Sequence, residues 1–174
     1  AALHLMRTGA AGVLVGFGGG AAHTTRRTLG IHAPIASAIA DVAAARRDYL
    51  DESGGRYVHV IADGGVGTSG DIVKAVACGA DAVMLGAALA RAAEAPGRGF
   101  HWGPEAHHAT LPRGERVEVG TVGSLEEILF GPGRSADGTT NIIGALRRAM
   151  ATTGYSDVKE FQRVEVVVAP HSHA

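Results

Sequence analysis

Three short apolar runs follow one another along the first half of the chain, and each one leads into glycine within two residues. Their sequences are VLVG at 13–16, VHVIA at 58–62 and AVMLG at 82–86. Short runs that are rich in β-branched residues and apolar on both alternating faces are typical of parallel strands with both faces covered. The pattern therefore predicts three strands of a buried parallel sheet.

Helical patterns fill the intervals between these runs. Residues 39–50 (IADVAAARRDYL) are rich in alanine and arginine, and residues 69–78 (SGDIVKAVAC) carry apolar side chains at helical spacing before Gly79. A helix is also expected at the start of the chain, where Leu3 and Met6 share one face. A series of strand, glycine-rich loop, helix and strand predicts an α/β fold.

Two α/β folds are built from such a series, the doubly wound sheet and the (β/α)₈ TIM barrel. A complete barrel takes about 250 residues, whereas this chain has 174 residues and three clear strands. The chain also starts without methionine, inside a helical pattern. We therefore expect the C-terminal part of a (β/α)₈ barrel, cut from a longer polypeptide and followed by a C-terminal helical tail.

A dinucleotide-binding turn is a weaker interpretation of the first glycine loop. Gly16, Gly18 and Ala21 have the spacing G-x-G-x-x-A. In that motif a helix starts within the glycines and an acidic residue closes the next strand about 20 residues later. Here Pro34 interrupts the segment and Asp41 falls in a predicted helix, so this interpretation fails.

The composition changes near residue 94, where most of the prolines and the single tryptophan begin to appear. A long segment of this kind is usually a functional lid or an ordered excursion. His101, His107 and His108 surround Trp102, but their spacing matches no common zinc site. We expect three parts: a partial barrel with phosphate-binding loops (1–95), a long flap-like excursion (96–140), and C-terminal helices at 141–152 and 157–162 with a terminal strand at 164–169 (141–174).

Charge and cysteine content narrow the class of protein further. Lysine and arginine total 16 against 17 acidic residues, which favours neither nucleic acid nor a membrane surface as a partner. The arginine pair Arg46 and Arg47 is expected to face solvent. Cys78, the single cysteine, cannot form an intramolecular disulfide and is expected to be a packing residue. These features predict a cytoplasmic protein.

Two of the glycine loops could bind an anion. DGGVGTSGD (63–71) follows the second predicted strand and LGAAL (85–89) follows the third. Unpaired backbone N–H groups at such loops favour negative charge, and in barrels the loops after the seventh and eighth strands commonly share one phosphate. Asp63 could then accept hydrogen bonds from ribose hydroxyls beside the phosphate, although tight turns without a ligand are the simpler interpretation.

Three stretches of the chain resemble a known family. GFGGGAAHTTRRTLGIHAPIASAIADVA, VIADGGVGTSGDIVKAVACGADAVMLG and NIIGALRRAMATTGYSDVKEFQRVEVVV are similar, in this order, to the C-terminal half of the catalytic barrel of the IMP dehydrogenase/GMP reductase family. The resemblance implies strands like the sixth to eighth of the barrel. It also implies a purine nucleoside monophosphate (IMP or GMP) as ligand, and NAD or NADP as redox partner.

The resemblance assigns roles to individual residues. It implies that Asp63 binds ribose and that Gly64, Gly65 and Gly86 bind phosphate, while Ala21 and Ala87 stand where the family has phosphate-contacting serines. Thr25 corresponds to a threonine that helps to move protons during catalysis. Carbonyl groups of Gly18 and Gly20 correspond to ligands of a monovalent cation such as K⁺.

His23 stands at the position of the family's catalytic cysteine. The family mechanism needs a thiolate that attacks the purine, and imidazole forms no comparable adduct. His23 could be a pocket residue in a relative that binds nucleotide without turnover, as in the relatives with His-Thr-Thr here. It could instead serve as an acid or base in altered chemistry, or it could only cap the loop.

Three functions therefore remain open. The chain could be an NAD(P)-linked oxidoreductase impaired by His23, a catalytically silent nucleotide-binding relative, or an FMN-binding barrel, since flavin barrels share these phosphate loops. The outer strands would have unpaired edges. We therefore expect the chain to pair with the missing N-terminal half of the barrel or with other copies, up to the homotetramer that the family implies.

Overall fold

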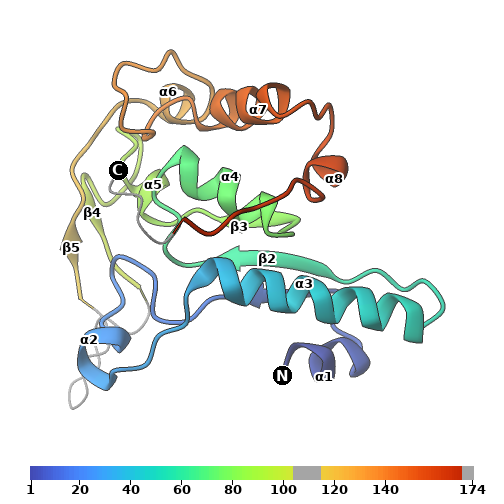
Figure 1. The fold of residues 1–174 in the computed structure, drawn as a ribbon. Helices are drawn as coiled ribbons and strands as arrows, with labels where there is room; N and C mark the ends of the chain where they lie inside the picture. Colours follow the sequence, from blue (N-terminus) through green and yellow to red (C-terminus); the bar gives the residue numbers. More distant parts are fainter. Residues whose placement is uncertain (104–114, 170–174) are drawn as a thin grey trace.

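The computed structural model describes residues 1–103 and 115–169. Its centre is a parallel sheet of three strands in the order β1-β2-β3 (Figure 1). The strands are β1 (Gly12–Val15), β2 (His59–Asp63) and β3 (Ala82–Met84). Val13 pairs with Val60 and Ala62 pairs with Val83, so the carboxyl ends of all three strands lie at the same edge. The predicted α/β fold and its three strands are confirmed.

Helices precede and connect these strands. They are α1 (Ala2–Arg7) before β1, α2 (Thr25–Leu29) and α3 (Ile35–Glu52) between β1 and β2, and α4 (Ser69–Ala77) between β2 and β3. The predicted helices at the start of the chain and before the third strand are confirmed, and α3 starts earlier than predicted. α4 starts sharply because Thr68 and Asp71 form a capping box.

The core lies on one face of the sheet. Val13 and Val15 of β1 and Val60 of β2 are buried against α1, α3 and α4. The alternate residues point the other way, and Leu14 and Met84 are 54% and 46% exposed. Within residues 1–103 and 115–169 nothing covers this second face, in contrast to the burial on both faces that the sequence predicts.

A second core lies on the far side of α4 from α3 (Figure 1). It joins α4 to α6 (Leu125–Phe130), α7 (Ile142–Thr152) and α8 (Val158–Phe161). Buried Ile128, Ile142 and Phe161 pack there with α4. The predicted C-terminal helices therefore exist and form the layer outside α4.

The segment predicted as an excursion has structure of its own. It contains β4 (Phe100–His101) and β5 (Val117–Glu118), which pair antiparallel, and α6. Ser124 and Glu127 form a second capping box, which explains why α6 starts there. Because Ile128 of α6 lies in the same core as α7, the predicted boundary at residue 140 does not separate two packing units.

Two expectations are wrong. Residues 164–169 form no strand, and Val167 and Val168 are 78% and 85% exposed. Arg46 does not face solvent: its side chain is buried and donates a 2.6 Å hydrogen bond to Asp81. The periodicity of α3 could not reveal this partner, because Asp81 is 35 residues away.

The edges of the sheet are open in the part of the chain that the structure describes. β1 and β3 each pair with β2 alone, as the sequence predicts. Among the described helices, none has both the length and the apolar character needed to cross a lipid bilayer.

Candidate functional site

Three loops meet at the carboxyl edge of the sheet, and glycines allow their backbones to touch. A Cβ at Gly16 would overlap the carbonyl group of Asp63, and a Cβ at Gly19 would lie 3.2 Å from the backbone of Gly64 and of Gly65. Only glycine permits such an approach. The first glycine loop is therefore packed directly against the loop that follows β2.

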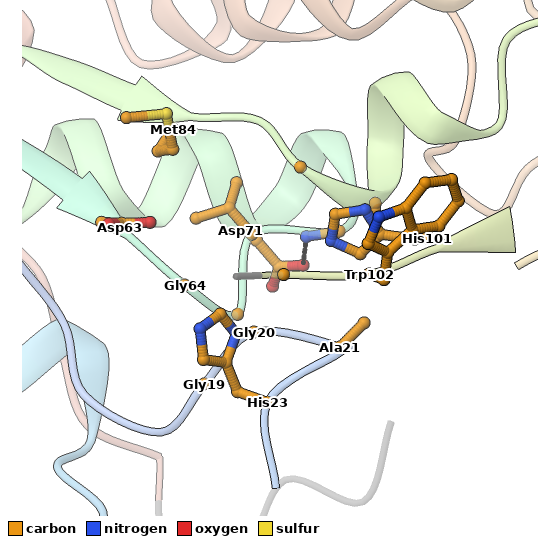
Figure 2. Close-up of a pocket in the computed structure, with 16 residues that line it drawn as sticks. Gly19, Gly20, Ala21, His23, Asp63, Gly64, Asp71, Met84, His101 and Trp102 are labelled. Carbon is orange, nitrogen blue, oxygen red and sulfur yellow. Dashed lines mark hydrogen bonds between the residues drawn. The ribbon is translucent and has the colours of Figure 1, made fainter. Parts of the chain in front are cut away.

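The loops enclose a hollow of about 440 Å³, which is open to solvent (Figure 2). The short helix α5 (Ala87–Ala90) starts at its rim. Most of the residues singled out in the sequence line this hollow together: Gly20, Ala21, His23, Asp63, Gly64, Gly65, Gly86 and Ala87.

Gly18 and Thr25 lie beside this hollow but do not line it. They line an adjacent hollow of about 200 Å³, into which His23 and Asp63 also reach. Thr25, the first residue of α2, is only 3% exposed. The two hollows therefore meet at His23 and Asp63.

The Asp63 carboxylate and the neighbouring amides are not hydrogen-bonded within the described part of the chain. Among the described residues no group donates a hydrogen bond to the Asp63 carboxylate, and none accepts from the backbone N–H groups of Gly65, Gly86 or Ala87. A polar group without an internal partner can be satisfied only by water or by a ligand. This edge therefore presents one carboxylate and a set of N–H donors to the hollow.

The start of α4 is different, because its own side chains occupy it. The Asp71 carboxylate accepts hydrogen bonds from the backbone N–H groups of Gly67 and Thr68, at 3.2 and 3.1 Å, and Ser69 donates to the carbonyl of Gly138. Although burial opposes it, the bond from Thr68 and the ion pair with Lys74 lower the pKa of Asp71. An incoming anion would have to displace Asp71, so the available amides are those closer to the strands.

His23 is held against the loop that carries it. Its backbone N–H donates to the carbonyl of Gly20 at 3.0 Å, and a Cβ at Gly20 would lie 2.6 Å from Nδ1 of the ring. Figure 2 shows the ring rising from the loop into the hollow, on the side of Gly64. The imidazole ring can therefore lie against Gly20 only because this residue has no side chain.

The segment between β3 and α6 supplies another wall of the hollow. The backbone N–H of Glu115 donates to the carbonyl of Ala22, and the side chain of Glu115 pairs with Arg27. His101 and Trp102, at the end of β4, line the hollow together with Gly103. The flap-like segment is thus tied to the first glycine loop.

Sequence reasoning missed several lining residues. Met84 ends β3 with its side chain on the open face, and Asp71 could have been found from the capping-box spacing T-x-x-D. His101 and Trp102 had no such signal, because a two-residue strand leaves no periodicity. Their place depends on the pairing of β4 with β5.

The described residues do not form a metal centre. No group of three or more histidine, cysteine or acidic side chains gathers in the described part of the chain, and His107 and His108 lie outside it. Gly18 and Gly20 offer two carbonyls, and that of Gly20 already accepts from His23. Two carbonyls cannot replace the hydration shell of K⁺, so these residues do not fit a cation site by themselves.

Comparison with known proteins shows which family the chain belongs to. The sequence profile of the IMP dehydrogenase / GMP reductase domain matches residues 1–173. An uncharacterized oxidoreductase of Mycobacterium leprae is 57% identical over 171 residues, which cover 97% of this chain and 46% of that protein. An inosine-5'-monophosphate dehydrogenase of Aquifex aeolicus is 35% identical over 174 residues, with 91% of this chain and 34% of that protein covered.

A solved structure is similar in both sequence and shape. The crystal structure of an IMP dehydrogenase/GMP reductase-like protein from Corynebacterium glutamicum superposes with a TM-score of 0.90 at 56% identity, and covers 97% of this chain and 44% of that protein. The chain thus spans less than half the length of these relatives. By its profile, its relatives and its fold, the chain belongs to the IMP dehydrogenase/GMP reductase family.

Proposed function

We propose that this chain binds a purine nucleoside monophosphate, IMP or GMP, in the hollow at the carboxyl edge of its sheet. The observation that carries the proposal is the set of partnerless polar groups around that hollow. One carboxylate and several backbone N–H donors face the same space, within the size of a small-ligand pocket. A nucleotide has the complementary groups, ribose hydroxyls that donate and a phosphate that accepts.

The phosphate would lie between the loops after β2 and β3. The N–H groups of Gly64, Gly65, Gly86 and Ala87 border the hollow there. Backbone amides that meet in this way make an anion site without a basic side chain. Asp63 would accept hydrogen bonds from the ribose hydroxyls, which places the base toward Met84 and His23.

His23 decides what the site can do with the bound base. The ring is fixed beside Gly20 at the mouth of both hollows, where it can contact a purine. An imidazole supplies no thiolate, so the covalent purine adduct of the family mechanism does not form. We therefore propose a nucleotide-binding member of the family with its NAD(P)-linked oxidoreductase chemistry impaired. Thr25 lines the second hollow together with His23. Without an adduct, the proton transfer that the family implies for Thr25 would not take place.

The first glycine loop does not form the dinucleotide turn by which some folds hold NAD or NADP. α2 begins at Thr25, beyond the glycines, so Gly16, Gly18 and Ala21 do not lead into a helix N-terminus as a dinucleotide turn does. The proposal therefore concerns the mononucleotide alone.

The three strands would correspond to the sixth to eighth strands of a (β/α)₈ barrel. The parallel order, the helices on one face and the open face that carries Leu14 and Met84 all support this. The inside of a barrel is filled by side chains from all its strands. In the complete fold further strands, or further copies up to a tetramer, would cover this face and the two open edges. Light scattering on the 174-residue chain would measure self-association.

Calorimetric titration of the chain with IMP, GMP and FMN tests the proposal. We expect saturable binding of IMP or GMP, and loss of that binding in Asp63→Ala. The matched control is Asp41→Ala, which removes an exposed carboxylate on α3. Wild type and control should bind alike.

Two results would contradict the proposal. A folded chain that binds neither purine nucleotide has no formed mononucleotide site. Binding of FMN in preference to IMP and GMP would assign the phosphate loops to a flavin. Reduction of NAD or NADP by the wild-type chain in the presence of IMP would leave the binding site intact but overturn the inference of impaired chemistry from His23.

A further inference from the structure

The described residues that line the hollow bring no permanent positive charge. Its lining includes Asp63 and Asp71 but no lysine or arginine among the described residues. The two non-glycine residues beside the anion-binding amides, Ala21 and Ala87, bring no hydroxyl group. A phosphate bound there would meet backbone dipoles and two carboxylates. Among the described residues, the lining side chains that can become cationic are His23 and His101.

His101 lies directly against the loop that follows β3. A Cβ at Gly86 would lie 3.3 Å from both Cε1 and Nε2 of the His101 ring. β4, which carries His101, also packs against α5, whose first residue is Ala87. Nε2 of the imidazole, which can donate a hydrogen bond, therefore lies close to Gly86, and Ala87 is the next residue along the chain.

The charged groups around His101 are engaged elsewhere or lie across the hollow. Arg91, which follows α5, donates to the carbonyl of Val119 at 3.0 Å. On β5, Val117 is opposite His101, so Glu118 is opposite Phe100 and on the other face of the small sheet. The guanidinium of Arg116 lies over the ring of Phe100 at 4.2 Å.

Among the described residues, the other titratable groups that line the hollow are Asp63 and Asp71 after β2 and His23 after β1. The Asp71 carboxylate is held by Thr68 and Lys74. Asp63 is the ribose acceptor of the proposed mode, so it would face the sugar hydroxyls rather than the phosphate.

We propose that His101 is a phosphate ligand of this site and that its protonation makes nucleotide binding depend on pH. The inference rests on the proposed function and adds to it a charged residue, supplied by the flap-like segment. Imidazole is the side chain that gains a positive charge between pH 8 and pH 5. A protonated ring donates a charge-assisted hydrogen bond, which is roughly twice as strong as a neutral one. Nucleotide binding should therefore strengthen as the pH falls.

The test is calorimetric titration with IMP and with inosine between pH 8 and pH 6. Inosine has the same base and ribose but no phosphate. His101→Gln keeps a hydrogen-bond donor but cannot become charged, and His4→Gln makes the same change at an exposed site on α1. The phosphate itself takes up a proton near pH 6, but this titration is the same for all variants and cancels in their ratio.

We expect wild type and His4→Gln to bind IMP more tightly than His101→Gln by about tenfold at pH 6, since hydrogen bonds to charged groups are the strong ones. The difference should shrink toward pH 8. Inosine should bind all three proteins alike. A His101→Gln protein that follows the wild-type pH profile for IMP overturns the inference and leaves the proposed function standing.

Two other outcomes also decide the matter. An inosine affinity that depends on His101 as strongly as the IMP affinity does would place the ring against ribose or base, which contradicts a phosphate contact. A wild-type chain that binds neither IMP nor GMP at any pH refutes the proposed function, and the inference fails with it.

Discussion

The carboxylates at the two edges of the sheet differ in their hydrogen bonding. At the carboxyl edge Asp63 has no internal hydrogen-bond donor among the described residues and faces a hollow. At the amino edge Asp81, just before β3, accepts from Arg46 at 2.6 Å, from Tyr57 at 2.6 Å and from the backbone N–H of Val60 at 2.8 Å.

Asp81 is bound from still more elements. Lys159 of α8 forms an ion pair with it, and the amide group of Gln162 donates to it at 3.1 Å. One buried carboxylate thus ties α3, β2 and the C-terminal segment together. Although burial opposes it, the bonds from Lys159 and Tyr57 hold the pKa of Asp81 well below its usual range.

This difference in hydrogen bonding distinguishes groups that stabilise the fold from groups that are available to a ligand. In barrel proteins the carboxyl ends of the strands carry the site and the amino ends serve stability. Here the hydrogen bonding differs in the same way: Asp81 at the amino edge holds several elements together, whereas Asp63 at the carboxyl edge has no donor among the described residues.

The largest effect is expected from Asp81→Ala. Removing one partner of a buried ion pair leaves Arg46 buried and uncompensated, which costs about 3–5 kcal/mol. Urea unfolding followed by circular dichroism measures the loss. A change no larger than that of an ordinary surface substitution would show that the buried network does not hold the amino edge together.

A smaller effect, of a different kind, is expected from Asp63→Asn. The variant keeps the shape of the side chain but loses a charged acceptor, so affinity for IMP should fall by about 1.5–3 kcal/mol, or roughly 10- to 100-fold. Stability should stay within about 0.5 kcal/mol, because no internal bond is lost. Asp41→Asn is the control. A strongly destabilised Asp63→Asn would mean that this carboxylate has a structural role after all.

Acid is expected to lower the free energy of unfolding of the wild-type chain, because it protonates Asp81. Because the pKa of Asp81 is lower in the folded chain than in the unfolded chain, its contribution is fully present above about pH 4 and is lost as the pH falls further. Wild-type stability should therefore fall between pH 4 and pH 2 more steeply than that of Asp81→Asn. Parallel stability curves for the two proteins would contradict this assignment.

The smallest effect is expected at an ion pair on the surface. Arg7 and Glu52 form two hydrogen bonds, at 2.8 and 2.6 Å, but both side chains are exposed. Water and salt screen such pairs. Glu52→Ala should unfold at the same urea concentration as wild type, and a loss as large as that of Asp81→Ala would erase the distinction between buried and exposed pairs.

Much of the site could be predicted from sequence because its signals are local. Each strand ends in glycine within a few residues, and parallel strands place those ends at one edge, so Asp63, Gly65 and Gly86 were expected together. The partners Arg46 and Asp81, and the place of His101 beside Gly86, depend on contacts between distant segments. The open second face was missed because apolar alternate residues look the same whether or not the described chain covers them.

Amide nuclear magnetic resonance during a titration with IMP would locate the bound nucleotide on the sheet. We expect the resonances of Gly64, Gly65, Gly86 and Ala87 to shift with IMP, while those of Val60 and Asp81 at the amino edge stay in place. Shifts confined to the amino edge or to the outer helices, or no shifts in a folded chain, would contradict the assignment of the carboxyl edge as a nucleotide site.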